Sequence, residues 1–438
     1  MHTLIIGAGA AGMAAAIAAA RQGQRVTVLE RGRKALKKLG VTGNGRGNLL
    51  NAGLVENVLT HPRTVFSPDG DLLPFVQKRY YGDPAFAAKV LAQRPWEQIA
   101  DFLQSCGIAL DEEDEGRMYP SSYLASTAVE ALLLEAEKLG VRIETCTRAL
   151  RIEPGFTVHA LRAEYAEDTQ RKNGKSKPGA LLGETAVTYR ADRVIVTVGG
   201  AAAPMHGTDG TSYGLLSELG HTVTPLYPAL CALTTEDPLP QSLAGQRIRC
   251  EAALSRPDGE PVREEGEVLF AQDGVSGIAA MQLARFVRPG CVLMLDLRRG
   301  VMGNQCHQPA VRWLQERAPN ARNMGEVLVG AASGALSRWL LQRAGCSVSD
   351  AVTPERLQAL AAEMECVMLP LGGTRGFEAA QVTAGGVRTA EFDPLTMESR
   401  LVPGVYAAGE VLDVDGACGG FNLMFAFASG IIAATGKH

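Results

Sequence analysis

The sequence is poor in aromatic residues and has no excess of one charge. Of its 438 residues, 5% are aromatic and 21% are charged. Lysines and arginines number 43 against 47 aspartates and glutamates, giving a formal net charge of -4. This balance argues against nucleic acid or a membrane surface as partner, although it leaves room for a local basic patch. With 46% hydrophobic residues and 49 glycines, the composition is that of a globular protein rather than a disordered or collagenous chain.

Paired cysteines and long uninterrupted hydrophobic segments are also missing. The nine cysteines are scattered singly, which argues against a zinc ribbon or a secreted disulfide framework and favours a cytoplasmic protein with reduced thiols. We expect no metal site, because Cys306 and His307 have no further ligand at metal-binding spacing. Glycines interrupt the apolar residues 4–20, and residues 421–435 are short for a membrane span of about 20 residues. We expect both segments to be buried elements of a soluble protein.

The first thirty residues predict a β-α-β unit. Residues 3–6 and 25–30 are short and apolar or β-branched, as in strands covered on both faces. The alanine-rich residues 13–21 between them predict a helix. Two strands joined by a helix indicate a parallel, doubly wound sheet.

A dinucleotide-binding fingerprint lies inside this unit. Gly7, Gly9 and Gly12 form the pattern G-x-G-x-x-G between the first strand and the helix. These glycines permit a tight turn, close approach of a pyrophosphate to the backbone, and close packing of helix on strand. Glu30 ends the second strand, where a carboxylate can accept hydrogen bonds from ribose hydroxyls. The pattern predicts dinucleotide binding without deciding between FAD and NAD.

The loop at residues 37–48, KKLGVTGNGRGN, suits a phosphate group or a flavin edge. Its glycines would let main-chain N–H groups point inward. The alternative is a solvated, flexible basic loop. The side chains that offer hydrogen bonds or positive charge are those of Lys38, Thr42, Asn44, Arg46 and Asn48.

The C-terminal segment favours FAD. A strand at residues 405–408 delivers Gly409 and Glu410 at its carboxyl end, where ligands bind in open α/β sheets. An apolar helix then opens at Phe421, and its positive end can stabilise negative charge on a reduced flavin. An NAD-binding domain needs no such second site. The alternative is a buried C-terminal helix preceded by a glycine turn.

The α/β pattern at both ends of the chain predicts a discontinuous domain. We expect a Rossmann-like FAD-binding domain of the two-dinucleotide-binding type, built from residues 1–203 and 364–438. The insert at 204–363 should hold a barrel-like part at about 204–275 and a helical part at about 276–363, since short β-like runs give way to helical spacing.

Together these motifs resemble the aminoacetone-oxidase-like and 3-dehydro-bile-acid-reductase-like flavoproteins, a family of NAD(P)/FAD-dependent oxidoreductases. The resemblance spans nearly the whole chain. Further motifs that carry it stand at residues 116–120, 198–200, 207–210, 274–277 and 382–387. Two positions depart from the family pattern: Gly47 stands where the family usually has cysteine, and residues 271–274 replace a Thr-His-x-Gly run.

The resemblance implies FAD bound by residues from both ends of the chain. The implied residues are Gly7, Gly9, Gly12, Glu30, Thr42, Gly43, Asn44, Gly45, Arg46, Gly199, Gly409, Glu410, Asp413, Gly419, Gly420, Phe421 and Asn422. We add the neighbouring positions Ala10, Ala11, Arg31, Lys38, Asn48, Val198 and Gly200.

Candidates for catalysis carry weaker signals. Arg117 and Arg375 could face a substrate carboxylate and Tyr119 could act as a proton donor, although each is better interpreted as a structural or surface residue. Cys418 precedes the C-terminal glycines and is better interpreted as a buried, inert thiol than as a redox group. His206 we interpret as a loop or hinge residue.

The sequence therefore predicts an FAD-dependent oxidoreductase. It would transfer a hydride between a donor, NAD(P)H in our interpretation, and a small organic acceptor. One alternative is an amine oxidase that uses oxygen. Another, of a different class, is a flavin-binding redox sensor or assembly factor that docks a partner through helices at residues 311–360.

Overall fold

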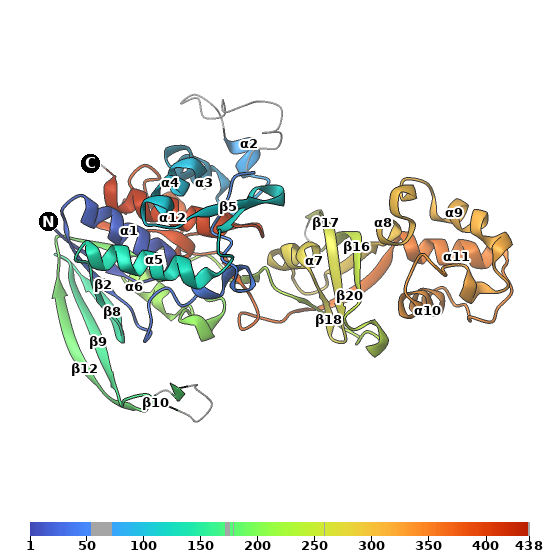
Figure 1. The fold of residues 1–438 in the computed structure, drawn as a ribbon, viewed down its shortest axis with the longest axis horizontal. Helices are drawn as coiled ribbons and strands as arrows, with labels where there is room; N and C mark the ends of the chain where they lie inside the picture. The colour runs from blue at the N-terminus through green and yellow to red at the C-terminus, as the bar shows by residue number, and fades with distance from the viewer. Residues whose placement is uncertain (54–71, 171–175, 178, 258, 437–438) are drawn as a thin grey trace. The chain divides into compact units, whose positions relative to one another are not determined.

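The computed structural model describes residues 1–53, 72–170, 176–177, 179–257 and 259–436. The chain forms two compact units (Figure 1). Unit 1 combines Met1–Tyr227 with Val382–His438, and unit 2 is Pro228–Gln381.

Unit 1 is built on a five-stranded parallel sheet in the order β22-β13-β1-β2-β7. Its strands are β1 (His2–Ile6), β2 (Arg25–Leu29), β7 (Arg142–Glu144), β13 (Arg193–Val196) and β22 (Val405–Ala407). Ile6 lies opposite both Leu29 and Val196. The carboxyl ends of the central strands therefore meet at one edge, and the predicted parallel α/β fold is confirmed.

Helices α1 (Ala10–Arg21), α5 (Ala125–Lys138) and α12 (Phe421–Thr435) lie close together in this unit (Figure 1). Helix α1 packs directly on α12, because a Cβ atom at Gly430 would stand 2.3 Å from the carbonyl oxygen of Ala11. The first and last helices of the chain thus share one core.

Smaller elements complete unit 1. They are β3 (Leu50–Asn51), α2 (Leu73–Val76), β4 (Tyr80–Gly82), α3 (Pro84–Gln93), α4 (Trp96–Ser105), β5 (Leu110–Glu113), β6 (Arg117–Pro120), β8 (Thr147–Glu153), β9 (Thr157–Tyr165), β10 (Thr169–Gln170), β11 (Ser176–Lys177), β12 (Leu181–Arg190), α6 (Gly214–Ser217), β21 (Val382–Ala384) and β23 (Val414–Gly416). Strand β14 (Tyr227–Ala229) stands at the boundary.

Unit 2 contains a closed barrel in the order β15-β18-β17-β16-β19-β20. The strands are β15 (Leu233–Thr235), β16 (Arg247–Arg256), β17 (Gly259–Ala271), β18 (Gly274–Ser276), β19 (Val292–Asp296) and β20 (Val367–Thr374). The helices of this unit are α7 (Ile278–Leu283), α8 (Arg298–Met302), α9 (Ala310–Arg317), α10 (Gly334–Arg343) and α11 (Pro354–Glu365) (Figure 1).

The structure divides the insert differently from the predicted limits of 204 and 363. Its compact unit starts and ends later, at Pro228 and Gln381. The separation into a barrel at 204–275 and helices at 276–363 is corrected too, because β19 and β20 follow residue 275 and belong to the barrel. Strand β15 pairs with β18 on one side and β20 on the other, so a strand from the end of the insert closes the barrel. Proline and glycines inside β20 weaken its strand signal.

No helix within the described ranges is long and apolar enough to cross a membrane. Helix α12, the most apolar, has 15 residues.

Candidate dinucleotide-binding site

The turn between β1 and α1 has the geometry that its glycines predict. Gly7 has φ of +106°, and a Cβ atom there would lie 2.5 Å from the carbonyl oxygen of Thr197. A Cβ atom at Gly12 would lie 1.9 Å from the carbonyl oxygen of Gly7. The Thr197 hydroxyl donates to that same oxygen at 2.8 Å. Glycine is therefore required at both positions for α1 to approach the sheet this closely.

The N-terminus of α1 is open to a ligand. Gly9 is its N-cap, and no side-chain cap bond forms there in the described part of the chain. A Cβ atom at Gly9 would have no neighbour within 4 Å among these residues. The first amides of the helix, from Ala10 and Ala11 onward, thus present unpaired donors and a positive dipole end, which fits a pyrophosphate.

Glu30 stands directly after β2 and is held by the main chain. Its carboxylate accepts hydrogen bonds from the amides of Ala8 at 3.0 Å and Gly32 at 2.6 Å. A carboxylate has about four acceptor positions, so two remain for ribose hydroxyls. The orientation of Glu30 beside the glycine turn fits the adenosine end of a dinucleotide.

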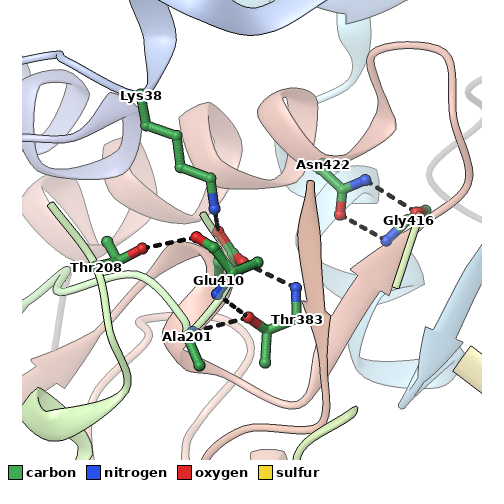
Figure 2. Close-up of polar contacts among 8 residues, drawn as sticks. Lys38, Ala201, Thr208, Thr383, Glu410, Gly416 and Asn422 are labelled. Atoms are coloured by element: carbon green, nitrogen blue, oxygen red, sulfur yellow. Dashed lines mark hydrogen bonds and ion pairs between the residues drawn. The ribbon is translucent and has the colours of Figure 1, made fainter. Parts of the chain in front are cut away.

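A second cluster joins residues from three distant parts of the chain (Figure 2). The ammonium of Lys38 lies 2.9 Å from the Glu410 carboxylate, whose other oxygen accepts from the amide of Thr383 at 2.9 Å. The Thr383 hydroxyl in turn accepts from the amides of Ala201 at 2.8 Å and Ala202 at 3.0 Å. These bonds fix the glycines that follow β13 against the end of β22.

Gly200 is part of this close contact. A Cβ atom there would stand 2.3 Å from the Thr383 hydroxyl and 2.7 Å from the Glu410 carboxylate. Gly199, with φ of +73°, lies against Thr208, whose hydroxyl donates to the carbonyl of Ala202 at 3.0 Å (Figure 2). Val198, which precedes them, is half-buried.

Residues 203–213, including the 3-10 helices η3 (Pro204–His206) and η4 (Thr211–Tyr213), are anchored beside Glu30. Arg31 forms an ion pair of 2.8 Å with Asp209, and Lys37 donates to the carbonyl of Met205 at 2.6 Å. The hydrogen bond from Arg31 holds the pKa of Asp209 well below its usual range. This segment, which we call the anchored segment, is a part of the site that sequence reasoning missed.

The start of α12 is tied to the N-terminal loop. The side-chain amide of Asn51 donates to the carbonyl of Gly419 at 2.8 Å. The Asn48 side chain, oriented to satisfy both neighbours, accepts from the amide of Gly420 at 3.2 Å and donates to the carbonyl of Leu50 at 3.2 Å. Gly420 is the N-cap with φ of +99°, and no described side chain caps this helix. A second open helix N-terminus thus faces the loop.

Asn422 stabilises the turn before α12. Its side chain accepts from the amide of Gly416 at 2.7 Å and donates to the carbonyl of the same residue at 2.9 Å (Figure 2). Ala11 lies beside Gly430, ten residues along α12 from Gly420. At 1.5 Å per residue, the two helix starts are separated by roughly 15 Å, a distance that an extended dinucleotide can span.

The loop at residues 39–47 is wound tightly rather than extended. Gly43, Asn44, Gly45 and Gly47 all have positive φ, and the Thr42 hydroxyl donates to the carbonyl of Leu39 at 2.8 Å. The glycine-rich sequence is therefore needed for the path of the backbone.

Arg46 points toward strands β5 and β6. Its guanidinium lies over the rings of Tyr119 and Tyr123, 4.5 and 4.8 Å from their centroids. It also forms a 2.5 Å ion pair with Glu113, which raises the Arg46 pKa. These contacts position Arg46 within the protein; contact with a bound dinucleotide stays a prediction.

Two of the predicted cofactor residues, the buried Phe421 and the half-buried Asp413, are held by contacts within the protein. The Phe421 ring packs edge-on against Tyr80 with 5.9 Å between centroids, and the Tyr80 hydroxyl donates to the Phe421 carbonyl at 2.8 Å. Burial raises the pKa of the Asp413 carboxyl, and the Asp413 carbonyl accepts from the amide of Asp83 at 3.1 Å. Their predicted role would have to be exerted through the backbone or by shaping the turn.

The three catalytic candidates belong to different units of the chain. Tyr119 is buried at 6% exposure in unit 1, and Arg117, on the same strand, pairs with Glu115. Arg375 belongs to unit 2, where its guanidinium donates to Asp273 at 2.9 Å.

Thiol and metal chemistry receive no support from the described side chains. Burial raises the pKa of the Cys418 thiol, which disfavours the reactive thiolate form. Among the residues that the structure describes, no group of three or more His, Cys, Asp or Glu side chains could hold a metal ion.

Some residues that make the contacts described above were not among the predicted site residues. Thr383 lies in the motif at 382–387, but nothing in its local pattern says that it bridges Ala201 and Glu410. Asn51 and Asp209 were missed for the same reason: their partners are more than 170 residues away in sequence.

The fold and the comparisons with known proteins place the chain in the class of Rossmann-type FAD-dependent oxidoreductases. The chain belongs to the HI0933-like family, whose Rossmann domain matches residues 1–68 and 72–436. The resemblance drawn from the motifs is thereby confirmed.

Named relatives cover nearly the whole chain. It is 32% identical to the 3-dehydro-bile acid delta(4,6)-reductase of Clostridium scindens, over 98% of this chain and 97% of the relative. It is 28% identical to the ribosomal RNA dihydrouridine synthase of Escherichia coli, over 97% and 95%. Among solved structures, a 3-ketosteroid-delta4-(5alpha)-dehydrogenase of Rhodococcus jostii aligns with a TM-score of 0.49 and 19% identity, over 99% of this chain and 96% of that one.

Proposed function

We propose that this chain uses NAD(P)H to reduce a carbon–carbon double bond conjugated to a carbonyl group, with FAD as the hydride carrier. The general redox activity is that of the family. The donor and the acceptor are the parts of this proposal that go beyond it. The acceptor is a small organic molecule in our first hypothesis.

The observation that carries the proposal is the chemistry common to two relatives with unlike substrates. The name of the reductase relative describes double bonds that extend from a 3-oxo group. The name of the dihydrouridine synthase relative describes saturation of the uracil ring, where the double bond is conjugated to a ring carbonyl. In a double bond conjugated to a carbonyl, the carbon remote from the carbonyl is the electrophilic one, so hydride would add there and a proton would add to the nearer carbon. One type of active site can therefore accommodate both reductions.

The residues of unit 1 would bind and orient the cofactor. When bound, FAD supplies the hydride transfer itself. The amides at the start of α1 would hold its pyrophosphate, and Glu30 would accept from its ribose. The open N-terminus of α12 would favour negative charge at the ring system. Lys38 and Glu410 neutralise each other between these points, so they leave the local charge balanced.

Tyr119 is our candidate for the proton donor. Burial raises the pKa of its phenol, so it keeps its proton at neutral pH. The Arg46 guanidinium over its ring stabilises the phenolate that donation would leave. Arg117 would attract an anionic substituent of the substrate.

Anaerobic titration of the purified, flavin-loaded protein tests the proposal. We expect NADPH or NADH to bleach the flavin absorption band and a 3-oxo-4-ene steroid acid to restore it with saturation of the double bond. Bleaching by a primary amine, with no response to either nicotinamide, would identify an amine oxidase instead. A flavin band that responds to none of these donors would contradict both enzymes and favour the redox-sensor alternative.

Reduction of uridine in ribosomal RNA is the second candidate, favoured by the 28% identical synthase relative. The net charge led us to expect no nucleic-acid partner. The match to this synthase relative leaves that expectation without support. Protein incubated with NADPH and undermodified ribosomal RNA should then produce dihydrouridine, detected by mass spectrometry of the nucleosides. Dihydrouridine formation without activity on steroid acids would replace the first candidate by the second.

A further inference from the structure

Two polar atoms on the anchored segment are buried without a partner. Among the described residues, four buried side-chain polar atoms lack a hydrogen bond, and two of them are Nδ1 of His206 and the hydroxyl of Tyr213. These atoms lie seven residues apart on the segment that Arg31 and Lys37 hold beside Glu30. Buried polar groups in native proteins are nearly always paired, so such a pair of exceptions calls for a missing partner.

Of these two atoms, the Tyr213 hydroxyl gives the stronger indication of a missing partner. Tyr213 is 5% exposed, so water cannot reach its hydroxyl freely. Its ring lies under the turn at Gly210, 3.9 Å from the position of a Cβ atom there. An unpaired hydroxyl in such a place costs stability, because it has lost its hydrogen bonds to water and gained none.

The surroundings of the Tyr213 hydroxyl belong to the candidate site. Burial, together with the nearby charges of Glu410 and Asp413, raises the pKa of this phenol far above its usual value. The hydroxyl therefore keeps its proton and is available as a donor. Glu410 is already engaged by Lys38 and by the amide of Thr383.

Tyr80 provides a contrast inside the same unit. It is buried as well, at 0% exposure, but its hydroxyl donates to the carbonyl of Phe421 at 2.8 Å. Burial of a tyrosine in this core therefore does not by itself leave the hydroxyl unpaired. The difference is that Tyr80 lies against the main chain of α12, whereas Tyr213 follows the glycine turn of the anchored segment.

We propose that the Tyr213 hydroxyl is kept unpaired by the protein so that it donates a hydrogen bond to the bound FAD. This inference rests on the proposed function, since it takes FAD to be the ligand of the site. It makes Tyr213 a cofactor-positioning residue that no part of the sequence pattern assigned. The neutral Nδ1 of His206, whose pKa is lowered by burial and by Lys37 and Lys38, would supply an acceptor on the same segment.

The test compares Tyr213→Phe with Tyr80→Phe in both the FAD-free and the FAD-loaded protein. Tyr213→Phe removes a hydroxyl that has no partner in the free protein, so the melting temperature of the FAD-free variant should stay equal or rise. Its FAD dissociation constant should increase about tenfold, the usual effect of one lost hydrogen bond. Tyr80→Phe breaks an internal bond, so it should lower the melting temperature of the FAD-free and the FAD-loaded protein alike.

Two results would overturn the inference. One is a wild-type FAD affinity in Tyr213→Phe. The other is a lower melting temperature of the FAD-free Tyr213→Phe protein, which would mean that the hydroxyl already has a partner within the chain. Both are distinguishable from failure of the proposed function, because in that case the wild-type protein itself would bind no FAD in the same titration.

Discussion

The ammonium of Lys38 lies 2.9 Å from the carboxylate of Glu410, although 372 positions separate the two residues. This pair joins the loop after the first β-α-β unit to the end of β22. Both side chains are about three-quarters buried, at 25% and 21% exposure. The two ends of the chain therefore contribute to one site, and the account of FAD binding depends on that junction.

Replacing Lys38 by Met should remove the ion pair that links the two ends of the chain. The Glu410 carboxylate would remain partly buried without its cation, which should lower the free energy of unfolding by about 1–2 kcal/mol and weaken FAD binding. The measurement is urea unfolding monitored with and without FAD. The control Lys37→Met removes a cation that bonds only a carbonyl oxygen on the anchored segment, so it should affect unfolding less. Equal losses in the two variants would show that the Lys38–Glu410 pair has no special role.

Two glycines in the first turn should respond differently to alanine. A Cβ atom at Gly12 meets the Gly7 carbonyl at 1.9 Å, so Gly12→Ala should cost about 3 kcal/mol or more of folding stability. Gly9 has room for a Cβ atom and an ordinary φ of -84°. Gly9→Ala should therefore fold like the wild type but bind FAD at least about tenfold more weakly, since the methyl group occupies the approach to the helix amides.

Thermal melting of the two FAD-free variants and titration with FAD separate these effects. A Gly9→Ala protein with unchanged FAD affinity would place the pyrophosphate elsewhere.

Thr383 should be needed for stability through its hydroxyl. Thr383→Val keeps the shape of the side chain but leaves the buried amides of Ala201 and Ala202 without an acceptor. We expect a loss of about 2–3 kcal/mol in the free energy of unfolding. Thr383→Ser keeps the hydroxyl and should lose less than about 1.5 kcal/mol. If the Thr383→Val and Thr383→Ser variants lose the same stability, the change in side-chain packing accounts for the loss and the hydroxyl does not.

The ion pair between Arg31 and Asp209 should make stability depend on pH in the acid range. The pKa of Asp209 is lowered in the folded protein, so its contribution is fully present above the unfolded pKa of about 3.9 and is lost as the pH falls toward the folded value. Asp209→Asn should therefore be less stable than wild type at pH 7, and the difference should shrink below about pH 4. Unfolding by urea across this range is the measurement. A difference that is constant from pH 7 to pH 2.5 would exclude the pairing as its cause.

The fold could be predicted where the signal is local. Gly7, Gly9, Gly12 and Glu30 lie within one β-α-β unit, and their spacing alone implies the turn, the helix start and the strand end that the structure contains. The long-range part could not be predicted in this way. Closure of the barrel depends on β20, whose pairing with β15 joins residues more than 130 positions apart.

The same distinction holds for the site. The glycines and acids were predicted because each has a conformational or charge requirement that shows in its own neighbourhood. Thr383 and Tyr213 act through contacts with residues far away in sequence, and a threonine or a tyrosine carries no conformational signal of its own. Only the structure shows that the Thr383 hydroxyl accepts two hydrogen bonds and that the Tyr213 hydroxyl has no partner among the described residues.

The flavin content of the purified protein tests the central claim most directly. Protein denatured in acid should release FAD, and not FMN, in a ratio of one per chain, identified by absorption and chromatography. Protein that emerges without flavin should take up FAD to the same ratio on incubation, whereas the Gly9→Ala variant should not. A wild-type protein that contains no flavin and takes up none would contradict the account.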